Sequence, residues 1–296
     1  MKAFIITILI ILPFISSFAQ DKSTNSIQDQ NPQLQTSLPK PRKLSNRVVA
    51  HRGGSMEAGV PDNSIEALNY AMNLGCYASE CDIYITKDNQ VIVAHADRQD
   101  KINGLYPWEA TYEQIATAAK LLNGEKIPNL EEYLDRLLQG GTTKLWLDVK
   151  SINSIPPGEA DEYTSRCSER ASEIVRQKRA NHFVEFIVAG EDIYIRTLKA
   201  AKGEWPCGLM DTKLSPQDFK DKGYKWANFQ DTKVFYHNGQ TSGLYSIEDY
   251  LKAGVAVSVY HVDTEQDKAW YGKRKDLFAM TTNYPKALLD ALKKIR

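Results

Sequence analysis

The sequence has no excess of charge of either sign. Lys and Arg together number 37, Asp and Glu together number 37, and the formal net charge at pH 7 is zero. Proteins that bind nucleic acid present a basic surplus, which is absent from this composition. We therefore expect a small-molecule partner and no nucleic acid.

Cysteine is scarce. The four cysteines stand at positions 76, 81, 167 and 207, and none of them has the C-x-x-C spacing of a structural zinc site. Cysteine is therefore not expected to ligate a metal. An even number in an exported protein permits disulfides, and Cys76 and Cys81 are close enough in sequence to form one. Alternatively, Cys81 faces a layer of helices as a small apolar residue.

Long apolar runs are absent except at the N-terminus. Residues 3–18 are almost entirely apolar after the charged Lys2, and Ser17-Phe18-Ala19 places small residues where a signal peptidase cleaves. We predict a signal peptide over residues 1–19, a periplasmic or secreted location, and no stable membrane insertion after cleavage. An uncleaved anchor is the alternative, but the run is short for a membrane span.

Residues 20–45 lack hydrophobic periodicity and are rich in Gln, Asn, Ser, Pro and Lys. This composition is typical of a disordered tether. We therefore predict that one folded domain occupies residues 46–296.

Strand-like and helix-like segments alternate along this domain, which is typical of a parallel sheet. The strand-like segments are residues 48–50, 79–86, 91–95, 144–150, 183–189, 207–210, 226–229, 255–260 and 277–281. Setting aside residues 91–95 leaves eight, the number of a closed barrel. A doubly wound sheet is the alternative, but no Gly-rich dinucleotide fingerprint follows the first strand. We predict an α/β fold, a (β/α)8 TIM barrel with an extra antiparallel hairpin strand after strand 2.

Residues 91–95 follow the second strand too closely to run parallel with it. A parallel crossover needs a dozen or more residues, whereas residues 87–90 form only a tight turn. The segment is therefore an antiparallel return strand. With the turn centred between Asp88 and Asn89, His95 is expected to lie directly opposite Asp82.

Titratable side chains are concentrated near the ends of the first strands. Glu80 and Asp82 share one face of their strand, while apolar residues occupy the other face. Because two carboxylates at this spacing repel each other on an internal strand, they indicate a bound cation. His51 follows the first strand, and Asp148 and Lys150 stand at the end of a later one. In a barrel, such strand ends line the active site.

Several motifs, in their order and spacing, resemble those of the glycerophosphodiester phosphodiesterases. The motifs are His51-Arg52-Gly53, Pro61-Asp62-Asn63-Ser64, Glu80-Cys81-Asp82, Thr86-Lys87-Asp88-Asn89, His95, Ile127-Pro128-Asn129-Leu130-Glu131-Glu132, Asp148-Val149-Lys150 and Thr282-Asn283-Tyr284-Pro285. The resemblance covers nearly the whole predicted domain. It implies a distorted (β/α)8 barrel that hydrolyses glycerophosphodiesters to glycerol 3-phosphate and an alcohol, using one divalent cation.

The resemblance also implies roles for single residues. The metal ligands correspond to Glu80, Asp82 and Asp148, the acid/base histidines to His51 and His95, and the phosphate-binding residues to Arg52 and Lys150. Three carboxylates suit a hard cation such as Ca²⁺ or Mg²⁺. One histidine can deprotonate the attacking group while the other protonates the leaving alkoxide. The attacking group is either the 2-hydroxyl of glycerol or water.

The chain departs from the family pattern at several positions. Asp148 and Asp62 each stand where the family usually has Glu, and Tyr260 stands where a tryptophan is usual. Asp148 and Lys150 are also similar to the sphingomyelinase D group of phospholipases, so an enzyme acting on intact lipid headgroups is an alternative. A non-catalytic barrel that binds phosphate is another.

The remaining histidines, at positions 182, 237 and 261, are interpreted as structural, although His261 follows a strand end and is placed to line the pocket. Trp226 and Tyr260 have two interpretations. They hold a quaternary ammonium headgroup by cation–π contact, or they belong to the core or rim, and the second interpretation is favoured.

Overall fold

The computed structural model describes residues 37–230 and 245–295. The chain divides into two units, residues 1–37 and 38–296, and every element below belongs to the second. The predicted signal peptide (1–19), most of the predicted tether (20–45) and His237 lie outside the described residues. Within the described ranges, no helix is both long and apolar enough to cross a membrane.

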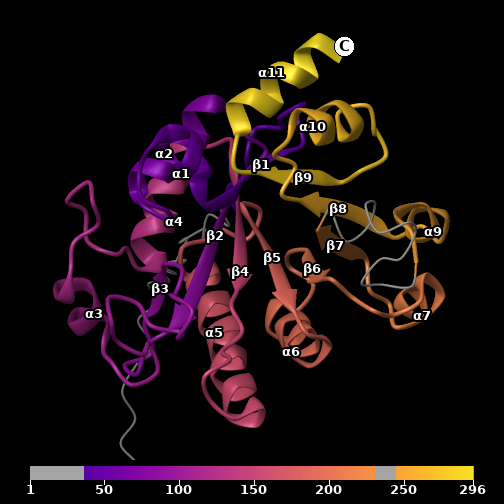
Figure 1. The fold of residues 1–296 in the computed structure, drawn as a ribbon. Coiled ribbons are helices and arrows are strands. Elements are labelled where there is room, and N and C mark those ends of the chain that lie inside the picture. Colours follow the sequence, from indigo (N-terminus) through magenta and orange to yellow (C-terminus); the bar gives the residue numbers. More distant parts are fainter. Residues whose placement is uncertain (1–36, 231–244, 296) are drawn as a thin grey trace, which may run out of the picture. The chain divides into compact units, whose positions relative to one another are not determined.

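Eight parallel strands form a closed ring, as predicted (Figure 1). In ring order the strands are β1 (Val48–Ala50), β2 (Ala78–Ile85), β4 (Lys144–Val149), β5 (Val184–Ala189), β6 (Cys207–Met210), β7 (Trp226–Gln230), β8 (Ala256–Tyr260) and β9 (Ala279–Thr282). The ring closes because β1 pairs with both β2 and β9. The fold is therefore a TIM barrel, and the carboxyl ends of all eight strands meet at one end of it.

A ninth strand, β3 (Val91–Val93), pairs antiparallel with β2 outside the ring. The predicted pairing of His95 with Asp82 is wrong by one residue, because Ala94 N donates to Asp82 O instead (3.1 Å). Thr86 N donates to Gln90 O (2.9 Å) and Asn89 is left-handed (φ 62°), so the turn has a three-residue loop. The turn is therefore centred on Asp88 and not between Asp88 and Asn89, which shifts the register by one residue, and β3 ends before His95.

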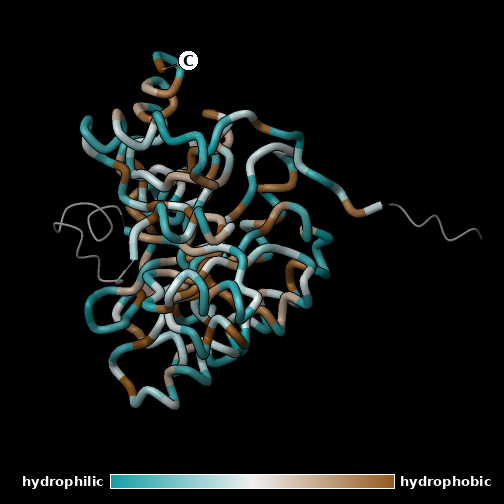
Figure 2. The backbone as a smooth tube through the Cα atoms, turned by 90° about the vertical axis from the view of Figure 1, so that its right-hand side faces the viewer, coloured by the Kyte–Doolittle hydropathy of each residue, from teal (hydrophilic) through white to brown (hydrophobic). Residues whose placement is uncertain are grey.

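Helices separate the successive strands of the barrel, and one more follows the last strand. They are η1 (His51–Gly54), α1 (Ser55–Ala58), α2 (Ile65–Leu74), α3 (Tyr112–Ala118), α4 (Leu130–Gly140), α5 (Pro157–Gln177), α6 (Glu191–Ala201), α7 (Pro216–Asp221), α9 (Ile247–Lys252), α10 (Glu265–Tyr271) and α11 (Pro285–Ile295). The boundaries of α2 follow from capping, because the Ser64 side chain accepts from Ala67 N and Gly75 ends the helix in the left-handed conformation. Short hydrophobic and hydrophilic stretches are interspersed along the described backbone (Figure 2).

The main hydrophobic core lies between the strands and the helices that surround them. All four cysteines are buried and free, so the disulfide between Cys76 and Cys81 is not formed. Cys81 instead packs among apolar residues of the main core, including Tyr133 and Leu134, which is the alternative that the sequence left open.

A second apolar cluster belongs to the segment between β3 and α4, residues 94–129, which we call the excursion. Its own residues Ile102, Ile115 and Ile127 pack against Tyr84 and Ile92 of the β2–β3 hairpin. The excursion is therefore held by a core of its own beside the barrel.

A buried ion pair lies at the amino-terminal end of the barrel. The Glu185 carboxylate accepts from Lys144 Nζ (2.5 Å), Trp146 Nε1 (2.6 Å) and Tyr77 Oη (2.8 Å). The Glu185 side chain is 1% exposed, so its charge depends on these donors. This network closes the barrel end opposite to the predicted site.

Replacing Lys144 with methionine is expected to lower the free energy of unfolding by about 3–5 kcal/mol, because the Glu185 carboxylate is left buried without its cation. Urea unfolding measures the loss. The matched control is Lys126→Met, which breaks an equally short but exposed pair with Glu132 and should cost about 0–1 kcal/mol. Equal losses in the two variants would contradict the prediction.

Candidate active site

Two strands position three carboxylates at the carboxyl-terminal end of the barrel. Glu80 and Asp82 extend from β2 and Asp148 extends from β4, where Asp82 and Asp148 are register partners. One oxygen from each carboxylate lies within 4.8 Å of the others, and all three residues are buried. The alternation along β2 produces this arrangement, since Cys81 and Ile83 point the other way into the main core.

Asp82 is the neutralised member of this cluster. Its Oδ2 lies 3.1 Å from Arg52 Nε, and its Oδ1 lies 3.3 Å from Lys150 Nζ. Asn63 also donates its amide Nδ2 to Oδ2 (2.9 Å). Burial alone would raise the pKa of Asp82, but Lys150 and Arg52 hold it below its ordinary value. Asp82 is therefore ionised.

Glu80 and Asp148 are less well compensated. Glu80 Oε1 and Asp148 Oδ1 are buried and have no hydrogen-bond partner among the described residues. Burial and the neighbouring Asp82 raise the pKa of both carboxyls, although Lys150 lies 3.0 Å from Asp148 Oδ2 and partly offsets the shift there. Ca²⁺ and Mg²⁺ are bound by oxygen ligands such as carboxylates, and this cluster offers two carboxylate oxygens that have no other partner among the described residues. These residues therefore fit a divalent cation.

Arg52 is held in place from three directions. Its backbone is left-handed (φ 48°), and its amide N donates to Glu80 Oε2 (2.9 Å). Its guanidinium Nη1 lies 2.8 Å from Asp62 Oδ2, while Asp62 Oδ1 accepts from Ser55 Oγ. Asp62, one of the departures from the family pattern, therefore orients Arg52. The next residue is glycine by necessity, because a Cβ at Gly53 would lie 2.6 Å from the Ala67 backbone.

His51 is oriented by a relay of two residues that sequence reasoning did not assign. Asn283 Nδ2 donates to Asp263 Oδ2 (2.6 Å), and His51 Nδ1 lies 2.7 Å from Asn283 Oδ1. Since a carboxylate only accepts, the Asn283 amide nitrogen must face Asp263 and its oxygen must face His51. The proton of neutral His51 is therefore on Nδ1, and Nε2 lies 3.8 Å from Glu80 Oε2 with its lone pair free. Asn283 belongs to the Thr282-Asn283-Tyr284-Pro285 motif, whereas no motif in the sequence contains Asp263.

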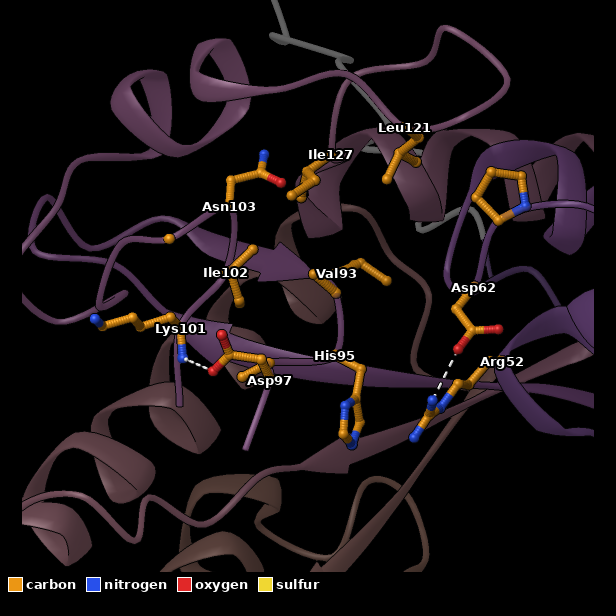
Figure 3. Close-up of a pocket in the computed structure, with 14 residues that line it drawn as sticks. Arg52, Asp62, Val93, His95, Asp97, Lys101, Ile102, Asn103, Leu121 and Ile127 are labelled. Atoms are coloured by element: carbon orange, nitrogen blue, oxygen red, sulfur yellow. Dashed lines mark hydrogen bonds and ion pairs between the residues drawn. The ribbon is translucent and has the colours of Figure 1, made fainter. Parts of the chain in front are cut away.

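His95 lies at the start of the excursion and lines a cavity together with Arg52. Its side chain is only partly exposed, and Figure 3 shows it between Arg52 and Asp97 at the edge of this cavity, which has a volume of about 390 Å³. Partial burial lowers the pKa of His95, Asp82 raises it, and Arg52 and Lys150 lower it further. The structure thus brings His95 into electrostatic contact with Asp82 although the two are not paired.

A smaller cavity of about 190 Å³ lies directly over the carboxylate cluster. Arg52 and Lys150 line it together with His51, Tyr260 and His261. The Tyr260 hydroxyl donates to Asp211 Oδ2 (2.7 Å), and the His261 ring packs edge-on against His51 with centroids 5.4 Å apart.

Trp226 is absent from the lining of both cavities. It is 2% exposed and packs with Trp146 inside the barrel, so its core interpretation is confirmed.

Comparison with known proteins gives the same family as the motifs. A model of the glycerophosphoryl diester phosphodiesterase family matches residues 51–286. A glycerophosphodiester phosphodiesterase of Caldanaerobacter subterraneus is 35% identical over 123 residues, which make up 39% of this chain and 49% of that protein. The chain thus matches about half the length of this curated relative.

Solved structures share the fold. A glycerophosphodiester phosphodiesterase from Parabacteroides distasonis superposes with a TM-score of 0.71 at 23% identity, covering 86% of this chain and 99% of that one. An Oleispira antarctica phosphodiesterase, solved with the product sn-glycerol-3-phosphate, superposes with a TM-score of 0.64 at 18% identity, covering 83% and 96%.

The stretch matched by the family model contains both histidines, the three carboxylates and the two cations of the site. The chain belongs to the glycerophosphoryl diester phosphodiesterase family.

Proposed function

We propose that the protein hydrolyses glycerophosphodiesters to glycerol 3-phosphate and an alcohol, and that a divalent cation is required. The observation that carries this proposal is the buried cluster of Glu80, Asp82 and Asp148, in which two oxygens lack a partner beside Arg52 and Lys150. A buried cluster of this kind is costly to maintain unless a cation completes it.

The charge of the site suits a phosphodiester once a divalent cation is present. When ionised, the three carboxylates of the cluster and the Asp62 carboxylate carry four negative charges, against two positive charges on Arg52 and Lys150. A divalent cation would cancel the remaining two, so that the site no longer repels the single negative charge of a phosphodiester. When bound, the cation would offset charge on the phosphate oxygens. Arg52 and Lys150 border the same cavity and supply the hydrogen-bond donors that hold those oxygens.

The two histidines flank this position and receive complementary roles. His51 borders the smaller cavity with its Nε2 lone pair free, which supports a role as the base that deprotonates the attacking hydroxyl or water. His95 borders the larger cavity, which supports a role as the acid that protonates the leaving alkoxide. Since Arg52 and Lys150 help to lower the pKa of His95, an anion bound between them favours its protonation.

A phospholipase that acts on intact headgroups and a non-catalytic phosphate-binding barrel receive no support of their own from the described residues. We therefore propose neither.

The proposed activity is tested by incubating the protein with glycerophosphocholine, glycerophosphoethanolamine and glycerophosphoglycerol in the presence of Ca²⁺, Mg²⁺ or a chelator. Glycerol 3-phosphate is measured with a coupled dehydrogenase, and ³¹P NMR reports any cyclic phosphate formed by attack of the 2-hydroxyl. We expect glycerol 3-phosphate only when metal is present. Failure to hydrolyse any of the three diesters would overturn the proposal.

A further inference from the structure

The two histidines of the site are held in different ways. The His51 ring is fixed by side chains, because Asn283 bonds to it and Asp263 orients Asn283. The His95 ring interacts with the backbone of the adjacent Ala96 and, among the described residues, forms no hydrogen bond with another side chain. The position of His95 therefore depends on the backbone that carries it.

That backbone is fixed on both sides of His95. Before it, Ala94 N donates to Asp82 O (3.1 Å), which continues the hairpin of β2 and β3. After it, Asp97 closes a short turn, since its amide N donates to Lys101 O (2.8 Å) and its Oδ1 accepts from Lys101 N (3.0 Å). Figure 3 shows this contact of Asp97 with Lys101 near His95. A contact that holds the turn therefore also holds His95.

Asp100 is the residue of this turn that bonds to another part of the fold. Its Oδ2 accepts from the backbone amides of Asn153 (2.8 Å) and Ser154 (2.7 Å), in the loop between β4 and α5. Lys150 stands shortly before them in the sequence. Among the described residues, these are the only hydrogen bonds between the excursion and residues 150–156. We call this contact the Asp100 link.

The local structure suits Asp100 to this contact. The residue is 6% exposed and left-handed (φ 60°), a conformation that Asp and Asn adopt more readily than most other residues. A buried carboxylate is costly unless hydrogen bonds satisfy it. The two amides precede α5 and belong to no helix or strand, so they also need an acceptor from elsewhere.

Lys150 does not depend on this link for its own position. Its Nζ lies 3.3 Å from Asp82 Oδ1 and 3.0 Å from Asp148 Oδ2, and its backbone N donates to Ile83 O (3.3 Å). Loss of the Asp100 link should therefore release the turn beside His95 and leave Lys150 in place.

We propose that Asp100 is a positioning residue that holds His95 relative to Lys150. This inference deepens the proposed function and rests on it for the role of His95 as the acid. His95 and Lys150 border different cavities that share Arg52, so an acid aimed at the phosphate held there must keep a fixed distance from Lys150. A displacement of about 1 Å at such a group can cost about 100-fold in rate.

A double-mutant cycle tests this role. Asp100→Gly removes the carboxylate and tolerates the left-handed backbone, and it should lower kcat for glycerophosphocholine about 10–100-fold with little change in KM. Because the effect acts through His95, the same change should cost less than about threefold when it is added to His95→Ala. Asp100→Asn keeps an acceptor oxygen and should retain most of the activity.

The leaving group gives a second test of the same role. On a p-nitrophenyl phosphodiester of glycerol, whose leaving group departs without a proton, Asp100→Gly should cost less than about threefold. A residue that only stabilised the fold would lower the rates on both substrates equally.

Glu125 provides the matched control. Its carboxylate also accepts from two consecutive backbone amides, those of Ile65 (2.8 Å) and Glu66 (3.1 Å), and so links the excursion to α2. No residue of the candidate site belongs to α2. Glu125→Ala should therefore lower the thermal unfolding temperature as Asp100→Gly does, yet change kcat less than about threefold.

NMR of the ¹⁵N-labelled protein without substrate gives a readout that needs no turnover. Asp100→Gly should speed hydrogen exchange at Asn153 and Ser154 and broaden or split the imidazole signals of His95, which the spectrum of His95→Ala identifies. Glu125→Ala should change neither.

Additive effects of Asp100→Gly and His95→Ala, equal losses on the two substrates, or unchanged His95 signals would overturn the proposal. If the His95 signals change as expected and no diester is hydrolysed, the proposed function fails while the positioning role of Asp100 stands. If glycerophosphocholine is hydrolysed and the two changes are additive, the proposed function stands and this inference fails.

Discussion

Replacement of His51 with alanine is expected to lower kcat for glycerophosphocholine at least 100-fold while leaving the fold intact, since general acid–base groups typically contribute about 10²–10⁴. His51 is partly exposed, and its ring bonds to Asn283 at Nδ1 and packs edge-on against the His261 ring. Its loss therefore removes Nε2 from the site together with one hydrogen bond and one ring contact, and no residue of the main core. Steady-state kinetics and thermal unfolding of the variant measure the two effects separately.

A change of leaving group separates His51 from His95. A p-nitrophenyl phosphodiester of glycerol has a leaving group that departs without a proton, so His95→Ala should recover most of its activity on it. His51→Ala should remain slow, because removal of the proton from the attacking group is still required. The control is His182→Ala, since His182 lies outside both cavities and should retain wild-type rates.

Two results would contradict these assignments. Activity of His51→Ala within about tenfold of wild type on glycerophosphocholine would exclude His51 as the base. Equal recovery of both variants on the p-nitrophenyl substrate would mean that the two histidines do not divide the roles of acid and base in this way.

Removal of the divalent cation is expected to have a comparably large effect. A metal ion that stabilises charge in a transition state contributes several kcal/mol, so chelation should lower kcat about 10³-fold or more. Glu80→Gln should reproduce this loss at metal concentrations that saturate wild type, because it removes one of three carboxylate ligands. Glu109→Gln, at an exposed position of the excursion, is the matched control.

The metal affinity should also depend on pH. Burial and the neighbouring Asp82 and Asp148 raise the pKa of Glu80 well above its ordinary value of 4.5. In the metal-free protein, Glu80 therefore stabilises the fold at pH values below 4.5, and this contribution is lost as the pH rises through the raised pKa. A cation must displace the same proton, so calorimetry should show tighter binding as the pH rises. An affinity independent of pH would contradict this.

Much of the fold was predictable because local and global signals agree. Ser64 and Gly75 mark both ends of α2, and the short turn after β2 requires an antiparallel partner. The register of that hairpin was not predictable from the length of the turn alone. It depends on Asn89 adopting a left-handed conformation, which is a single backbone choice that shifts His95 by one position.

The residues of the candidate site that lie within the sequence motifs were predictable. Glu80, Asp82 and Asp148 lie together because alternation on two register-paired strands places them on one face. The partners that orient the catalytic candidates were harder to infer, because Asp263 reaches His51 only through Asn283. The lining of the larger cavity was not predictable, because it depends on how the excursion packs.

The closure of the barrel has a consequence for the time course of folding. His51 and Asn283 are 232 positions apart, and they meet only because β1 and β9 become neighbours. Contacts of such high sequence separation carry a large loop-closure cost and tend to form slowly. A chain synthesised only as far as β8 already contains every residue predicted for the site, yet it lacks Asn283, the partner of His51 Nδ1. The orientation of His51 is therefore coupled to β9, so a growing chain does not complete the candidate site before Asn283 is in place.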